Sequence, residues 1–92
     1  MKTIDDFIEE ITEELSKSGL TVTPYPSHLE ISIKGIPIVG LYYYPTKGGY
    51  NLMVEEAELF QQVEEITRYT YLNRILLEVE KYTHLFPTIM AV

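Results

Sequence analysis

The sequence predicts an α+β fold in two layers, with an N-terminal helix, three or four strands and a C-terminal helical region. Three observations predict it: helical periodicity at the N-terminus, alternation with a period of two through the middle, and a second helical periodicity towards the C-terminus. The short connections favour an antiparallel meander sheet, with both helical regions packed on one face. We expect residues 1–92 to form a single acidic domain, because 92 residues are too few to bury two cores.

The first element is an amphipathic helix over residues 4–18. Thr3 is suited to be its N-cap, and Asp6, three residues later, completes an approximate capping box. Gly19 suits the left-handed position that ends a helix. The apolar residues that define its buried stripe are Ile4, Phe7, Ile8, Ile11 and Leu15.

Strand periodicity follows from residue 20. Residues 20–23 alternate before two prolines, residues 29–34 alternate cleanly, and residues 36–44 and 50–54 supply a third and a fourth strand. The two glycines within residues 46–49 favour a hairpin connection.

The third strand has apolar residues at both odd and even positions. Which set faces the helices is therefore a hypothesis. We assign one set to the helix-covered face: Ile36, Ile38, Tyr42 and Tyr44. We assign the other set to the open face: Pro37, Val39, Leu41 and Tyr43.

The C-terminal region has helical periodicity over residues 59–82. Thr67–Tyr71 is rich in β-branched and aromatic residues, so one long helix and two helices broken there are both compatible with the pattern. Pro87 ends the helix and leaves Thr88–Val92 as a short apolar tail, which docks on the domain or on a partner.

The charge distribution restricts the classes of partner. The net charge is −7, with six acids in residues 1–18 and five acids and no base in residues 55–67. Lys and Arg form no cluster, so we expect no direct binding to nucleic acid and none to an anionic membrane. The chain has no cysteine, which fits a cytoplasmic location and leaves no disulfide or thiolate site.

No catalytic motif is present, so we expect no enzyme activity and no cofactor. The only histidines are His28, expected in a loop, and His84, near the end of the last helical region. Glu80 and His84 are four residues apart, a spacing compatible with two metal ligands, but a third ligand has no predictable position. We therefore interpret this pair as solvent-exposed and expect no metal.

The sequence favours an interaction module that binds another protein. Eight of 92 residues are tyrosine, a residue common at interfaces because its ring is apolar and its hydroxyl tolerates water. We expect Val39, Leu41 and Tyr43 to form a contact surface on a tyrosine-rich sheet face, through which the chain associates with itself as a homodimer. The acidic segment adds three interface candidates: Glu55, Glu56 and Glu58.

An alternative function is an acidic mimic of nucleic acid. If both helical regions pack side by side, their outer acids form one negative surface that fits a basic DNA- or RNA-binding site. In element order and acidity the chain resembles small phage and mobile-element proteins, some of which inhibit host defence nucleases. The resemblance is one of layout and charge and implies no functional residue.

Overall fold

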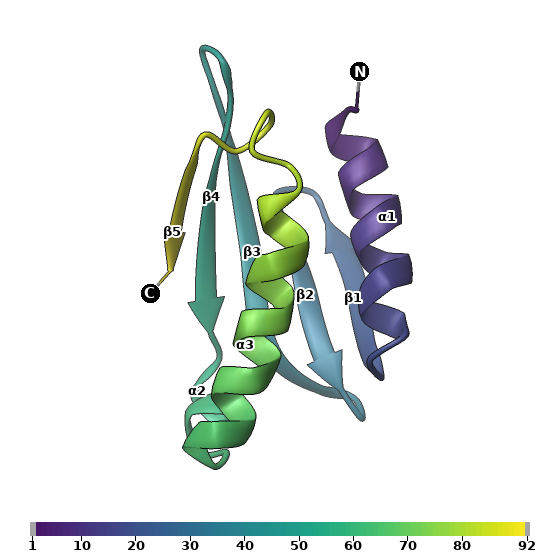
Figure 1. The fold of residues 1–92 in the computed structure, drawn as a ribbon, viewed down its shortest axis with the longest axis vertical. Coiled ribbons are helices and arrows are strands. Elements are labelled where there is room, and N and C mark those ends of the chain that lie inside the picture. The colour runs from purple at the N-terminus through teal and green to yellow at the C-terminus, as the bar shows by residue number, and fades with distance from the viewer. Residues whose placement is uncertain (1, 92) are drawn as a thin grey trace.

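The fold is a sheet covered on one face by helices, as Figure 1 shows, which confirms the predicted α+β class and meander. It is described from a computed structural model over residues 2–91. The elements follow in the order α1 (Ile4–Ser16), β1 (Leu20–Tyr25), β2 (His28–Ile33), β3 (Ile36–Thr46), β4 (Gly49–Glu56), α2 (Glu58–Gln61), α3 (Glu65–Glu80) and β5 (Thr88–Ala91).

Helix α1 begins where the sequence predicts. The Thr3 side chain accepts from the Asp6 backbone and the Asp6 carboxylate accepts from the Thr3 backbone, so the capping box is complete. The helix ends at Ser16, two residues earlier than predicted, and Gly19 follows with a φ of +78°. Its buried residues are Phe7, Ile11 and Leu15.

The strands lie in the order β1-β2-β3-β4-β5. Two-residue connections join the first four strands: Pro26-Ser27, Lys34-Gly35 and Lys47-Gly48. Such short connections permit only antiparallel neighbours, so the meander follows from them. The fifth strand, β5, lies parallel to β4 and was not predicted, because the apolar tail contains too few residues to show a period.

A β-bulge in β3 decides which side chains the helices cover. Ile31 of β2 lies opposite Val39, whereas Ser32 lies opposite Pro37, so Ile38 has no partner in the ladder. One extra residue moves every later side chain of the strand to the opposite face of the sheet. Both Ile38 and Val39 are buried as a result.

The expectation that Val39, Leu41 and Tyr43 lie on the open face is therefore wrong. Their exposed fractions are 1%, 0% and 9%, and they belong to the core beneath the helices. Tyr42 and Tyr44, which we assigned to the covered face, lie on the opposite side of β3. The face assignment would hold for a hairpin without a bulge, since Lys34-Gly35 alone would place Ile38 opposite Ile31.

The C-terminal region forms two helices, but they do not break where the sequence suggested. The interruption is at residues 62–64, between α2 and α3, and Thr67–Tyr71 lies inside α3. The chain after α3 is anchored by Phe86, whose ring meets that of Phe7 at 4.8 Å and an interplanar angle of 70°. This anchor explains why the tail docks as β5.

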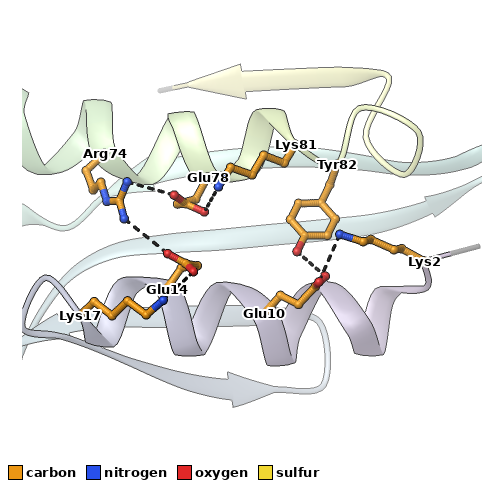
Figure 2. Close-up of polar contacts among 8 residues, drawn as sticks. All are labelled: Lys2, Glu10, Glu14, Lys17, Arg74, Glu78, Lys81 and Tyr82. Carbon is orange, nitrogen blue, oxygen red and sulfur yellow. Dashed lines mark hydrogen bonds and ion pairs between the residues drawn. The ribbon is translucent and has the colours of Figure 1, made fainter.

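Acids and bases alternate between α1 and α3, as Figure 2 shows. Arg74 bridges Glu14, at 3.6 Å, and the buried Glu78, at 3.0 Å. Lys17 also pairs with Glu14, and Lys81 pairs with Glu78, each at 2.9 Å. Glu14 and Glu78 are thus neutralised locally by bases of the same layer.

Tyr82 makes a further link between the two helices. Its hydroxyl donates to the Glu10 carboxylate at 2.5 Å, and Lys2 pairs with the same carboxylate at 3.1 Å. Burial and this hydrogen bond raise the pKa of Tyr82, while the hydrogen bond and Lys2 lower the pKa of Glu10. The helix layer is therefore held together by polar contacts above an apolar interior.

Within residues 2–91, no helix combines the length and the apolar character that crossing a bilayer requires.

Candidate functional site

The face of the sheet opposite the helices carries a row of large side chains across all five strands. The strand registers place Tyr25 beside His28, His28 beside Tyr42, Tyr42 beside Met53 and Met53 beside Met90. Residues paired across a ladder project from the same side of a sheet. We call these five residues the aromatic–methionine row.

Three rings of this row are stacked. The Tyr25 and His28 ring centroids are 4.8 Å apart with planes 10° apart, and those of His28 and Tyr42 are 4.7 Å apart with planes 16° apart. The ends of the row are the most open, since Tyr25 is 43% and Met90 55% exposed. Preformed stacking limits ring motion, so these side chains lose less conformational entropy when a partner binds.

A second row lies beside the first. It consists of Thr23, Glu30, Gly40 and Glu55, paired in that order across β1, β2, β3 and β4. Neighbouring strands are about 4.8 Å apart, so the two carboxylate-bearing strands are roughly 10 Å apart with a glycine between them. Two acids thus flank a position that has no side chain.

Gly40 is required by the ring next to it. A Cβ at this position would lie 2.6 Å from Cε2 of Tyr42, far inside van der Waals contact. The Tyr42 ring occupies the space that a side chain at position 40 would fill, so the two residues together determine the shape of the face. A substitution at Gly40 would displace the ring and disturb the stack.

A shallow hollow of about 200 Å³ opens at the Gly40 end of this face. Carboxylates dominate its lining: Glu30, Glu55, Glu56 and Glu58. Among these four, Glu56 pairs with Arg68 at 3.4 Å between Oε1 and Nε. No Lys or Arg occurs in any of the strands formed by residues 2–91, so the surface here is anionic.

The predicted site residues fall into two groups. Val39, Leu41 and Tyr43 are core residues, although Val39 also borders the hollow. Glu55, Glu56 and Glu58 all line the hollow, although Glu56 is half-buried. The sequence thus grouped three acids that lie together at the hollow, whereas the assignment of the aromatic residues to a face of β3 was wrong.

The residues that sequence reasoning missed are those of the aromatic–methionine row. The signal for Tyr25 and His28 was the two-residue spacing of the first hairpin, which places Tyr25 opposite His28. The signal for Tyr42 depended on the bulge, and Met90 depended on the docking of the tail as a strand.

The two histidines have different surroundings in the described part of the chain. His28 is held between two tyrosine rings, and Glu80 and His84 are both exposed. Within residues 2–91, no three side chains of the metal-ligating types converge. The open face places aromatic and methionine side chains beside acids.

Comparison of the chain with protein-family models, with curated proteins and with solved structures found no match.

Proposed function

We propose that this protein is a non-catalytic interaction module that binds a basic segment of another protein across its open sheet face. The observation that carries the proposal is the juxtaposition on that face of the aromatic–methionine row and the row that contains Glu30 and Glu55.

The aromatic–methionine row supplies apolar contact area. Tyrosine and methionine are enriched at protein interfaces, tyrosine because a rigid ring buries much surface at small entropic cost. Methionine adapts its shape to different partners, and the row ends on the exposed Met90. A partner that lies across the strands would contact every member of the row.

The acidic row supplies selectivity for positive charge. Glu30 and Glu55 lie on either side of Gly40, and the strands offer no base to neutralise them. An arginine of the partner would pair with a carboxylate while its planar guanidinium lies close to the tyrosine rings. The net charge of −7 would also accelerate encounter with a basic partner.

The helix layer supports the acidic-mimic alternative less well. There Glu10, Glu14 and Glu78 are engaged by Lys2, Arg74 and Lys81. A mimic of the phosphate backbone needs a continuous line of unpaired charges, because its affinity comes from counterion release along that line. The open sheet face combines charge with apolar area, which favours a protein ligand.

The test is binding of a fluorescent arginine-rich peptide, measured by anisotropy. We expect the double variant Glu30→Gln, Glu55→Gln to weaken binding about tenfold, since each partly exposed ion pair contributes about 0.5–1 kcal/mol. We expect Tyr42→Ala to weaken it as well, by removing the ring that stacks on His28 at the middle of the aromatic–methionine row.

The matched control is Glu9→Gln, Glu13→Gln, which removes two exposed acids from α1 and gives the same net charge of −5 (−7 plus 2). It should change the affinity less than twofold, by our estimate about 0.4 kcal/mol or less. Equal weakening by both double variants would mean that the peptide responds to total charge, and the proposal would fail.

A further inference from the structure

The outer edge of β5 is an unpaired strand edge. β5 lies at one end of the sheet and pairs only with β4 among the strands of residues 2–91. In Figure 1 it lies beside β4 with neither α1 nor α3 over it. Unpaired backbone N–H and C=O groups along such an edge can hydrogen-bond with another extended strand.

This edge lacks the features that normally prevent association. β5 contains no charged side chain and no proline, and among the side chains that follow Lys81 only that of His84 can carry a charge. The opposite edge differs, because β1 contains Pro24, which lacks a backbone donor. In a protein with a net charge of −7, β5 is thus a strip without charged side chains, at which a second copy would meet less side-chain repulsion than at the acidic strands.

We infer that two copies of this chain associate antiparallel through their β5 edges. A two-fold axis perpendicular to the sheet keeps the open faces of both copies on the same side. A residue whose side chain lies on the open face must therefore pair with a residue of the second copy whose side chain also lies on the open face. If Met90 lies opposite Met90 of the second copy, Ile89 pairs with Ala91 of that copy and Pro87 lies outside the ladder. In the alternative register Ile89 would lie opposite Ile89, and Pro87 would enter the ladder. Pro87 has no backbone N–H, so a hydrogen bond of that ladder would be missing.

The association would join two open faces into one. Met90 ends the aromatic–methionine row, so opposed Met90 residues would make the row continuous across both copies. The inference stands independently of the proposed function, because it rests on backbone edges and not on Glu30 or Glu55. Salt separates the two: screening should weaken a basic peptide's binding, whereas association of two anionic copies should be unaffected or strengthened.

The first test is sedimentation of the wild-type chain and two lysine variants. The wild type should reach twice its mass of 10.7 kDa with rising concentration. Met90→Lys should weaken dimerisation about tenfold by opposing like charges at the axis. The charge-matched control Thr21→Lys, on the exposed part of β1, should dimerise as the wild type does. Circular dichroism checks that each variant is folded.

The second test uses the absence of cysteine from the chain. Met90→Cys should form a disulfide-linked dimer under mild oxidation, because opposed residues place their Cβ atoms about 5 Å apart. Tyr25→Cys, at the far end of the same row, should stay largely monomeric. A wild-type chain that is monomeric up to its solubility limit, or equal crosslinking of both cysteine variants, would overturn the inference.

Discussion

Truncation of two neighbouring residues of β3 should destabilise the protein to different extents. Leu41 is 0% exposed and lies between Leu29 and Val54, themselves 0% and 1% exposed, so its replacement leaves a cavity. Leu41→Ala should lower the free energy of unfolding by about 3 kcal/mol, within the usual range for a buried leucine. Tyr42 is half-buried on the open face, and Tyr42→Ala should cost only about 1 kcal/mol, chiefly the stack with His28.

Thermal unfolding followed by circular dichroism measures the difference. For a domain of this size, 1 kcal/mol shifts the melting temperature by about 4–8 °C, so Leu41→Ala should melt about 12–24 °C lower and Tyr42→Ala about 4–8 °C lower. Urea denaturation supplies the free energies directly. If Tyr42→Ala were the more damaging variant, the bulge would be absent and the faces of β3 would be reversed.

Three further predictions concern the open face and the helix layer. Gly40→Ala should leave the chain folded but displace the Tyr42 ring, shifting the NMR signals of the neighbouring imidazole; unchanged signals would count against the close contact. Because burial raises the pKa of Tyr82 and of Tyr43, the native state keeps both phenolic protons longer than the unfolded state. That stabilisation is fully present below about pH 10 and is lost as the pH rises through the raised pKa values, by up to about 1.4 kcal/mol per pH unit and tyrosine. Urea midpoints that stay flat above pH 10 would refute it, and Tyr82→Phe should reduce the slope. Arg74→Gln should cost about 1 kcal/mol, because the side chain is 39% exposed and a lysine still serves its buried carboxylate partner. A loss above about 3 kcal/mol would show that Arg74 alone holds the helices together.

The elements and their order could be predicted because each has a strong local signal. The stripe and capping box of α1 and the clean alternation of residues 29–34 are properties of short segments. The short hairpin connections then leave few topologies. The fold class follows from these signals without knowledge of any distant contact.

The faces of β3 could not be predicted, because one bulged residue controls them. Ile38 and its neighbours are apolar at every position, so no alternation indicates where the extra residue lies. The bulge is stabilised by a distant contact, since the Ile38 carbonyl accepts from the Ala57 backbone at 2.8 Å. β5 depended likewise on a non-local contact, the anchoring of Phe86 against Phe7.

Only part of the candidate site could be predicted from the sequence, because the rest depends on long-range strand pairing. The acids Glu55, Glu56 and Glu58 are consecutive or nearly so, and they stay together wherever the strand faces. The aromatic–methionine row comes from five strands and exists only when every register is set. Surfaces of this kind depend on long-range pairing and are absent from any single segment.

The most direct measurement is an amide chemical-shift map of the ¹⁵N-labelled chain during titration with an arginine-rich peptide. The largest shifts should fall on the open face, at His28, Glu30, Tyr42 and Glu55, with the exposed α1 acid Glu13 little affected. Shifts concentrated along α1 and α3, with an unperturbed sheet, would contradict the assignment of binding to that face.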